Sequence, residues 1–425
     1  MNVVSAADTA ALKVLLDRGW RVPDTVVSEV GEILRNVRAR GDAAIIEYAR
    51  AFDDERFDLS KLRVPIPMLE GARSLVSGEI GAALELAKER ITRFNDRQRQ
   101  PDVNYVEKDG TRYAVRRAAL RAAAVYAPRG GGAVAVLMGA VPAKIAGVAR
   151  IVVLSPATGD GISPSVLFAC ALCGVEELYA AGGAHAVAAA AFGTESIAAV
   201  DKIVGRGGLW TTEAKRQVFG ACGIDGLSGP AEVLVLADDG ANSEYVVGEL
   251  LAQAELPGVT RLAVISESRP LLEAIAQLID TLDLRTVERH EYVSDSIARH
   301  CRLIEAESRE SLFDLVNRIA PAYLSLQVRD ATAYLDRIYA AGTVLVGDMT
   351  PVVGGKYLAG TSHVTPSSGT ARFASSLSLA DFTRSFNVVE NTSERIANDA
   401  PVLAALAEAD GLPQHAQTAR MRAGS

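Results

Sequence analysis

The chain has 425 residues, of which 49% are apolar and 23% charged, and its formal net charge is −8. This length and composition are typical of a globular protein of two or three domains and exclude a disordered chain. Because the charge is negative and no basic run stands free of acidic residues, we expect no general attraction to a polyanion and no nucleic-acid partner.

Neither the first residues of the sequence nor its longest apolar tract indicates a secreted or membrane-spanning protein. Residues 1–19 lack a basic segment followed by an uninterrupted apolar core, so they do not resemble a secretory signal. The longest apolar tract, residues 132–154, is interrupted by Pro142, Lys144 and Arg150, which argues against a transmembrane helix. We therefore expect a cytoplasmic protein without membrane contact.

The predicted elements change in kind along the chain. Residues 23–100 have helical apolar spacing, whereas residues 122–240 alternate short β-rich runs such as "RIVVLSP" with alanine-rich helical runs. A second strand–helix series follows, from "AEVLVLAD" to "AGTVLVGD", and the last fifty residues are helical and amphipathic. Such alternation predicts an α/β fold with two doubly wound parallel sheets and right-handed crossovers.

Cys170 and Cys173 form a C-x-x-C pair within this alternation. The surrounding sequence, "SPSVLFACALCGVEEL", is apolar and helical, so both thiols are expected to be buried core groups rather than redox or zinc sites.

Three glycine-rich turns stand where a strand should pass into a helix. They are "YAPRGGG", "AAGGAHA", which carries His185, and "VGRGGLW". None is a G-x-G-x-x-G, and a flexible turn explains each as well as a phosphate site does. Because all three follow predicted parallel strands, together they indicate a ligand crevice at the carboxyl edge of a sheet.

Several strings together closely resemble the histidinol dehydrogenase family, in the same order from about residue 22 to 420. They are "CGVEELYAAGGAHAVAAAAFGTESIAAVDKIVGRGGLWTTEAKRQV", "GPAEVLVLAD", "ELLAQAE", "YLAGTSHVTPSSGTAR" and "SSLSLADF". The resemblance implies a zinc- and NAD-dependent enzyme that oxidises an amino alcohol to an amino acid in two steps.

The resemblance also implies an architecture of two incomplete Rossmann-like domains with parallel sheets, plus N- and C-terminal helical arms that are exchanged in a homodimer. The expected segments are an arm at 1–21, a first domain at 22–125 and 235–377, an inserted nucleotide-side domain at 126–234 and an arm at 378–425.

At the family's zinc ligands the sequence departs from the pattern. A Gln-Ala-Glu-His string is here "QAEL", which keeps Gln253 but has Leu256 for the histidine, and a Gly-Asp-Tyr string is "GKY", with Lys356 for the aspartate. His415 in "LPQHA" matches the last ligand. Zinc needs four N, O or S donors, and an ammonium repels it, so we predict no zinc.

The family's catalytic Glu-His pair is also absent. "PAYL" places Ala322 and Tyr323 at those positions, and alanine cannot activate water for the second oxidation. One hypothesis is that Lys356 polarises a substrate oxygen while Tyr323 accepts the proton, its pKa lowered by the ammonium. A core tyrosine and a solvated loop lysine are the structural alternatives.

The remaining candidate residues follow from the same resemblance. Tyr126, His185 and Gly208 stand at the family's cofactor contacts, so NAD or NADP is expected. Candidate contacts to a small-molecule substrate are Gln253, His363, Asp410 and His415, whereas Ala231 replaces a substrate-binding serine.

Two functions remain open at this point. The first is a zinc-independent, NAD(P)-dependent oxidoreductase, limited to two electrons, that acts on a small amino alcohol or related polar substrate other than histidinol. The second is an inactive paralogue with a ligand-binding or regulatory role.

Overall fold

A computed structural model describes the whole chain except residues 19–20, 130–131, 158–160 and 424–425. The chain divides into two compact units. The first comprises residues 1–98 and 120–382, and the second comprises residues 99–119 and 383–425. No helix within the described ranges is both long and apolar enough to cross a membrane.

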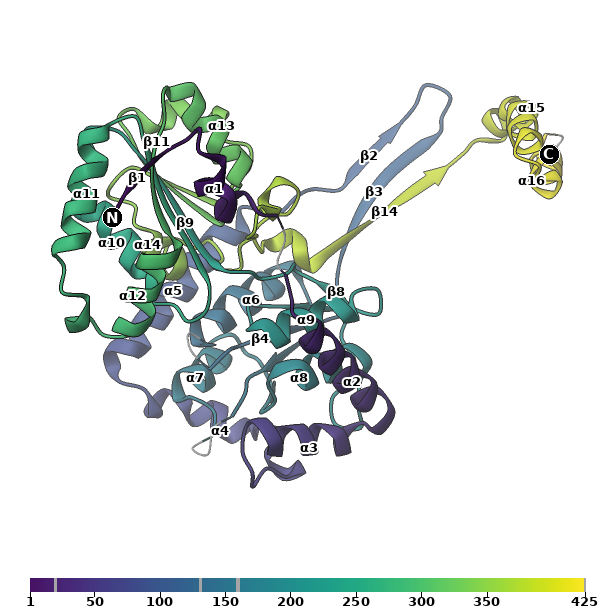
Figure 1. The fold of residues 1–425 in the computed structure, drawn as a ribbon. Helices are drawn as coiled ribbons and strands as arrows, with labels where there is room; N and C mark the ends of the chain where they lie inside the picture. Colours follow the sequence, from purple (N-terminus) through teal and green to yellow (C-terminus); the bar gives the residue numbers. More distant parts are fainter. Residues whose placement is uncertain (19–20, 130–131, 158–160, 424–425) are drawn as a thin grey trace. The chain divides into compact units, whose positions relative to one another are not determined.

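The first unit contains a six-stranded parallel sheet with the strand order β1-β11-β10-β9-β12-β13 (Figure 1). Its strands are β1 (Val3–Ser5), β9 (Ala231–Ala237), β10 (Thr260–Ser266), β11 (Cys301–Glu305), β12 (Tyr323–Gln327) and β13 (Thr343–Val346). Read from β9 in chain order, five of these strands follow the doubly wound order 3-2-1-4-5, so the direction of winding reverses between β9 and β12.

Helices cover both faces of this sheet because its central strands are apolar on both sides. Val233 and Val235 of β9 pack with α10 (Ser243–Ala254), α11 (Arg269–Thr281) and α12 (His290–His300). Leu234 and Leu236 point to the opposite core, formed with α1 (Thr9–Leu16) and α13 (Arg309–Ile319). Alternate residues of one strand therefore serve two cores.

A five-stranded parallel sheet, also in the first unit, has the order β6-β5-β4-β7-β8. Its strands are β4 (Ala122–Tyr126), β5 (Arg150–Leu154), β6 (Glu177–Tyr179), β7 (Lys202–Val204) and β8 (Gly223–Ile224). This is again 3-2-1-4-5, with the reversal between β4 and β7.

The two faces of the five-stranded sheet are covered by two sets of helices. One core joins it to α2 (Asp24–Arg40), α3 (Asp42–Phe52), α8 (Gly183–Phe192) and α9 (Leu209–Val218). The other joins it to α4 (Ile66–Glu70), α5 (Gly78–Asp96), α6 (Gly132–Ala146) and α7 (Pro164–Leu172). Cys170 and Cys173 are buried in the second core, as expected, and burial raises the pKa of Cys173 to about 12.

The two sheets confirm the predicted α/β class, but the residues that belong to each sheet and its helices differ from the expected domain boundaries. The helices between residues 24 and 96 pack on the five-stranded sheet, not on the six-stranded one to which residues 22–125 were assigned. Residues 1–21, expected to be an arm, add edge strand β1 to the six-stranded sheet and place α1 against α13. The apolar residues of this segment are buried against the core of the six-stranded sheet. Apolar periodicity predicts that such residues are buried, but it does not tell which of the two sheets they pack against.

The second unit combines a three-stranded antiparallel sheet with two helices. The sheet has the order β14-β3-β2, formed by β2 (Val103–Val106), β3 (Arg112–Ala119) and β14 (Thr383–Glu390). Helices α15 (Ser393–Ala409) and α16 (Pro413–Arg420) pack on each other. The expectation of a wholly helical segment at 378–425 is corrected by β14, whose eight residues all pair with β3.

Candidate active site

Lys356 lies in the last turn of the short helix α14 (Val352–Tyr357), which the helix α10 holds at both ends. Glu249 and Gln253 are four residues apart on α10 and so lie on the same face. Both Glu249 carboxylate oxygens accept the Val352 N–H, at 3.0 and 3.1 Å, at the start of α14. At its end, Lys356 Nζ donates to Gln253 Oε1 at 2.6 Å. The lysine is thus a fixed, partly buried group rather than a solvated loop residue.

The surroundings of Lys356 disfavour its ammonium form. Burial is the largest cause, and the positive charge of Arg206 adds to it, so the pKa of Lys356 falls to about 7 although Glu255 and Glu249 act in the opposite direction. Lys356 Nζ also lies 5.7 Å from the centroid of the Tyr323 ring. At neutral pH the site therefore contains a large fraction of free amine.

Arg206 is a site residue that sequence reasoning missed. It lies in the turn between β7 and α9, and its charge lowers the pKa values of Lys356, His363 and Tyr323. The available signal was a single basic residue inside the glycine turn "VGRGG", at the carboxyl end of a strand beside the reversal of winding.

A buried ion pair fixes the turn that carries Arg206. Asp225 Oδ2 accepts the Gly205 N–H at 2.6 Å, and Lys215 Nζ donates to the Gly205 carbonyl at 3.0 Å and also to Asp225. Both side chains of the pair are almost fully buried. Gly205 has a φ of +112°, and a Cβ there would lie 2.5 Å from the Tyr126 carbonyl oxygen, so only glycine fits.

Tyr323 corrects one part of the sequence-based hypothesis. Burial raises its pKa to about 12, against the opposing charge of Arg206, whereas a nearby ammonium was expected to lower it. The expected direction was wrong because only 1% of Tyr323 is exposed, and the resulting desolvation raises its pKa more than the positive charge of Arg206 lowers it. Tyr323 remains protonated at neutral pH and can donate a hydrogen bond, but it does not accept a proton.

Other polar groups near Lys356 have unused hydrogen-bonding capacity. Gln253 Nε2 is buried and has no hydrogen-bond partner in the described part of the chain, and the buried hydroxyls of Tyr323 and Thr365 interact with each other. Such groups are costly unless a ligand or water satisfies them. They are a set of donors suited to a polar ligand.

His363 belongs to the same group of residues. Its backbone N–H contacts Met138 Sδ at 3.2 Å, which ties its loop to α6. Burial, Arg206 and Lys356 together lower the pKa of His363 to about 3, so its imidazole is neutral. It can exchange hydrogen bonds with a ligand without adding charge.

Glu232 is the second residue that the sequence analysis missed. This buried β9 carboxylate accepts the Ala322 N–H at 3.2 Å and the Ser368 N–H at 2.8 Å, and burial raises its pKa. It therefore fixes the residue before Tyr323. A glutamate inside the apolar string "GPAEVLVLAD" was the signal.

The expected cofactor residues meet at the carboxyl edge of the five-stranded sheet. Tyr126 ends β4, and its Oη accepts the Gly183 N–H of α8 at 3.0 Å, two residues before His185. Gly208 is the N-cap of α9. Neither N-cap residue has a side chain that caps its helix, and Tyr126 Oη takes only the Gly183 N–H, so the other N–H groups in the first turns of α8 and α9 are available to an anionic ligand. Gly130 and Gly131 of the first glycine turn lie outside the described residues.

His185 is a neutral imidazole. Burial lowers its pKa to about 4, and its Nε2 lies 3.6 Å from Asp53 Oδ2, a carboxylate that also bonds Arg129 at 2.8 Å. Both His185 Nε2 and Asp53 Oδ2 are buried and lack a hydrogen-bond partner within the described ranges. A pocket lined by Arg129, Ser155 and Pro156 opens at the same edge. His185 Nε2, Asp53 Oδ2 and the first turns of α8 and α9 are polar groups that a nucleotide would satisfy.

The residues at the family's metal positions do not fit zinc. Gln253 Oε1 already accepts a hydrogen bond from Lys356 Nζ, and the Leu256 side chain has no atom that can coordinate a metal. Among the described residues, no three His, Cys, Asp or Glu side chains cluster closely enough to hold a metal ion.

Two candidates of the sequence analysis, Asp410 and His415, belong to the second unit. Asp410 is the C-cap of α15 and His415 lies in α16, and both side chains are exposed.

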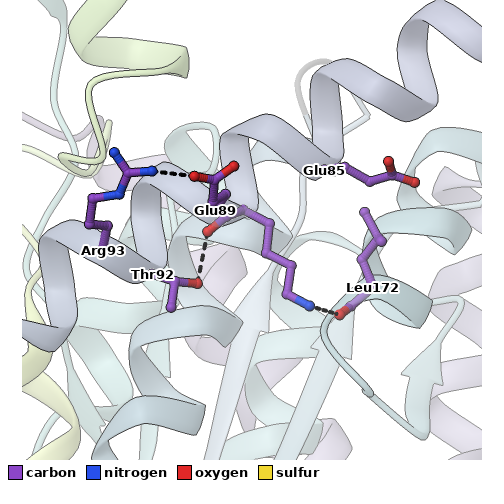
Figure 2. A pocket seen from close by; sticks show the side chains of 6 residues that line it. Glu85, Glu89, Thr92, Arg93 and Leu172 are labelled. Atoms are coloured by element: carbon purple, nitrogen blue, oxygen red, sulfur yellow. Dashed lines mark hydrogen bonds and ion pairs between the residues drawn. The ribbon is translucent and has the colours of Figure 1, made fainter.

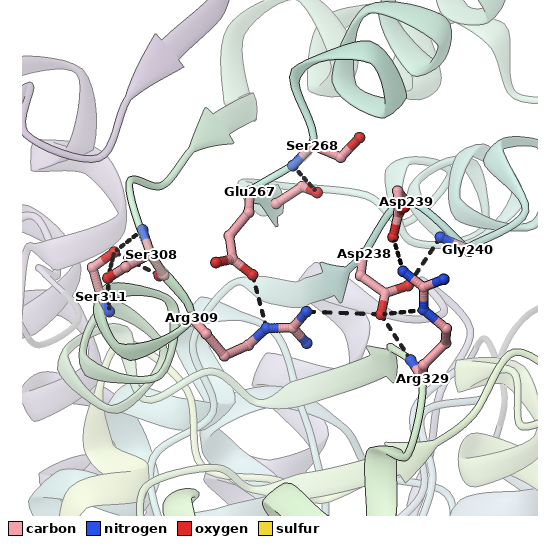
Figure 3. Close-up of polar contacts among 10 residues, drawn as sticks. Asp238, Asp239, Gly240, Glu267, Ser268, Ser308, Arg309, Ser311 and Arg329 are labelled. Carbon is pink, nitrogen blue, oxygen red and sulfur yellow. Dashed lines mark hydrogen bonds and ion pairs between the residues drawn. The ribbon is translucent and has the colours of Figure 1, made fainter.

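The other reversal of winding, between β9 and β12, is filled by ion pairs. Figure 3 shows Asp238 accepting the Arg329 N–H at 2.9 Å, with Arg309 Nε bonded to Glu267 at 2.7 Å. Asp238 also accepts the Gly240 N–H at 3.0 Å. Asp238 thus lies between Arg309 and Arg329 at the carboxyl edge of the six-stranded sheet, where Arg309 Nη1 and Gln327 Oε1 are buried without a hydrogen-bond partner among the described residues.

A surface pocket on α5 is also separate from the candidate residues. In Figure 2 it is lined by Glu85, Glu89 and Arg93 of α5 with Leu172 of α7. Lys88 Nζ donates to the Leu172 carbonyl at 2.7 Å and so caps the end of α7. None of the predicted site residues lines this pocket.

Fold and site together define a doubly wound α/β protein with two parallel sheets and a group of polar residues around one lysine. A family model for histidinol dehydrogenase matches residues 17–423. Histidinol dehydrogenases of Mesorhizobium japonicum and Agrobacterium fabrum are 39% and 40% identical, over 94% of this chain and 94% and 93% of theirs. The crystal structure of histidinol dehydrogenase from Elizabethkingia anophelis superposes with a TM-score of 0.92 at 29% identity, covering 99% of this chain and 98% of that one.

The chain therefore belongs to the histidinol dehydrogenase family. The resemblance identified from the sequence strings is confirmed.

Proposed function

We propose that this protein is a zinc-independent, NAD(P)-dependent oxidoreductase that converts a small polar alcohol, amino alcohols included, to its carbonyl compound. The observation that carries the proposal is the hydrogen bond of 2.6 Å between Lys356 Nζ and Gln253 Oε1. It puts an amine, rather than a cation ligand, at a position where the family pattern has a zinc-binding aspartate.

Lys356 is the general base in this proposal. With a pKa of about 7, its free amine can accept the hydroxyl proton as the C–H hydride departs. Tyr323 stays protonated, because burial raises its pKa to about 12, and can donate a hydrogen bond to the same oxygen. Gln253 Nε2 is left to bind a second polar group of the substrate.

The hydride acceptor would be held at the carboxyl edge of the five-stranded sheet. A nicotinamide dinucleotide supplies the two-electron oxidant when bound. The uncapped first turns of α8 and α9 would bind its pyrophosphate, and Tyr126 and the neutral His185 would contact the rest.

The substrate differs from histidinol and the reaction stops after two electrons in this proposal. Ala322 and Tyr323 stand in place of the family's Glu-His pair, so no carboxylate activates water for attack on the carbonyl product. The loss of a general base typically costs about a hundredfold or more in rate. The family resemblance implies that zinc helps to bind the imidazole and the amine of histidinol, and this chain lacks a complete set of zinc ligands.

Calorimetric titration with NAD and with NADP, alongside elemental analysis, tests the proposal on purified protein. We expect saturable binding of one nucleotide, less than stoichiometric zinc, and alcohol-dependent nucleotide reduction that survives a chelator. Stoichiometric zinc, with activity lost on chelation, would contradict it.

One observation favours a second candidate, an inactive paralogue that binds a ligand. Gln253 Nε2 is a buried donor without a partner in the described ranges, which suits ligand binding without any chemistry. In that case a polar ligand binds near Lys356 and neither nucleotide does.

We also infer a homodimer that uses the second unit. Its sheet and helices expose large apolar side chains, namely Tyr105, Val106, Val389, Leu406 and Leu412. Exposed apolar groups in such number are typical of an interface. Light scattering should give twice the chain mass, and a monomer at micromolar concentration would refute the inference.

A further inference from the structure

We propose that the carboxyl edge of the five-stranded sheet selects NADP over NAD, and that Arg129, Ser155 and Ser163 bind the 2′-phosphate of its adenosine ribose. The inference rests on the oxidoreductase function proposed above, which leaves the choice between the two nucleotides open. It assigns that choice to the side chains of one cavity.

The first support is the position of this cavity in the fold. In a doubly wound sheet, the adenosine ribose of a dinucleotide lies at the carboxyl end of the second strand. Here β4 is the first strand of the order 3-2-1-4-5 and β5 is the second. A cavity of about 190 Å³ is lined by Arg129 from the loop after β4 and by Ser155 and Ser163 from the loop after β5. Whole ligands of drug size fill about 300–1,000 Å³, so this cavity suits one part of a dinucleotide.

The second support is the type of residue that follows the second strand. An acidic side chain at this position binds the free 2′-hydroxyl of NAD, whereas a nearby arginine accommodates the 2′-phosphate of NADP. The strand β5 is followed by Ser155 and Pro156, and no carboxylate lines the cavity among the described residues. Asp160, further along the same loop, lies outside the described residues.

The six-stranded sheet provides a contrast within the chain. Its second strand, β10, is followed directly by Glu267, which is an acidic residue at the equivalent position. Glu267 already accepts a hydrogen bond from Arg309 Nε at 2.7 Å. One sheet thus has an acid that is paired within the protein, whereas the other has a cation and hydroxyl groups that line a cavity.

Arg129 is held in place without using all of its hydrogen-bonding groups. Its Nη2 donates to Asp53 Oδ1 at 2.8 Å and lies 3.4 Å from the Ala157 carbonyl oxygen. Half of the side chain is exposed, and Nε and Nη1 have no partner among the described residues. The planar fork of a guanidinium suits a phosphate group. Asp53 orients this fork and does not line the cavity, but its negative charge opposes an anion, so we expect a moderate preference.

The two serines supply uncharged donors. Only 3% of Ser155 is exposed, and its hydroxyl makes no hydrogen bond within the described part of the chain although the residue lines the cavity. Ser163 is the N-cap of α7 and makes no side-chain cap bond, and its Oγ lies 2.9 Å from Ser165 Oγ. The first turn of α7, where the helix dipole favours negative charge, therefore lines the same cavity.

Calorimetric titration of the full-length protein with NADP and with NAD tests the proposal. We expect NADP to bind about tenfold more tightly, which is the usual effect of one hydrogen bond to a charged group. In competition with NADP, 2′,5′-ADP should be at least about tenfold more effective than 5′-AMP, which lacks the 2′-phosphate, or inorganic phosphate, which lacks the ribose. Equal affinities for NADP and NAD would overturn the proposal, and so would inorganic phosphate that competes as well as 2′,5′-ADP.

A substitution assigns the preference to one side chain. Arg129→Gln should lose about tenfold in affinity for NADP and keep its affinity for NAD, and Arg129→Lys, which keeps the charge, should restore part of the loss. Arg93→Gln is the matched control, since Arg93 is a largely exposed arginine that pairs with Glu89 on α5, outside this cavity (Figure 2). An equal loss of affinity for both nucleotides in Arg129→Gln would overturn the assignment. The competition experiment on the wild-type protein does not depend on the folding of any variant.

Failure of the oxidoreductase proposal has a different signature. In that case NADP still binds more tightly than NAD, but no alcohol reduces it.

Discussion

The two parallel sheets share the strand order 3-2-1-4-5 but use their edges differently. At the carboxyl edge of the five-stranded sheet, glycine N-caps leave α8 and α9 without a capping side chain from the N-cap residue, although the Gly183 N–H donates to Tyr126 Oη. At the same edge of the six-stranded sheet, Asp238 pairs with Arg309 and Arg329 (Figure 3), and the polar residues around Lys356 lie instead near the start of β12. The strand order places a candidate ligand position at the reversal of winding in each sheet, and the side chains at each edge decide which of the two is free to bind a ligand.

The largest expected effect is on the glycine turn of the five-stranded sheet. Lys215→Met leaves the buried Asp225 carboxylate without its partner, and breaking such a pair typically costs about 3–5 kcal/mol. Urea unfolding should give a correspondingly lower free energy of unfolding. A loss below about 1 kcal/mol would mean that the pair does not hold this turn.

The next effect is on activity. Lys356→Met should lower kcat/KM for the alcohol by about a hundredfold or more, the usual contribution of a general base. Lys88→Met is the matched control, since Lys88 caps α7 from the surface pocket of Figure 2 and contacts none of the candidate residues. Equal activity of both variants would remove Lys356 from the mechanism.

Stability should depend on pH through the same lysine. Its pKa is 10.5 in the unfolded chain and about 7 when folded, so the unfolded state binds more protons between these values. The wild-type protein should therefore gain stability as the pH rises from 7 toward 10, while Lys356→Met should lack this contribution. Thermal unfolding at pH 6 and pH 9 gives the comparison, and parallel curves for both proteins would contradict the low pKa.

The smallest effect is expected at the ion pairs of the six-stranded sheet. Arg329 has 69% of its side chain exposed, and such pairs contribute about 0–1 kcal/mol. Arg329→Gln should leave the pH profile of kcat/KM unchanged, whereas Arg206→Gln should shift its lower limb to higher pH. Identical pH profiles for the two variants would contradict the inference that Arg206, and not Arg329, influences the site around Lys356.

The sequence was sufficient for the class of fold and for part of the site. Alternating strand and helix patterns predicted two parallel sheets, and "GKY" located Lys356 where the family pattern has an aspartate. The hairpin β2–β3 and strand β14 were missed, because β2 and β14 are largely exposed, β3 is mostly of intermediate burial, and none of the three shows a clear alternation.

What the sequence by itself determined is local: periodicity, glycine turns and the identity of the residue at each family position. Tertiary structure decided the charge states. The pKa of Lys356 falls and that of Tyr323 rises because burial acts on both, and because Arg206 reaches Lys356 from another sheet, 150 positions away in the chain. Desolvation and long-range charge depend on what surrounds an atom in space, and no short stretch of sequence contains that information.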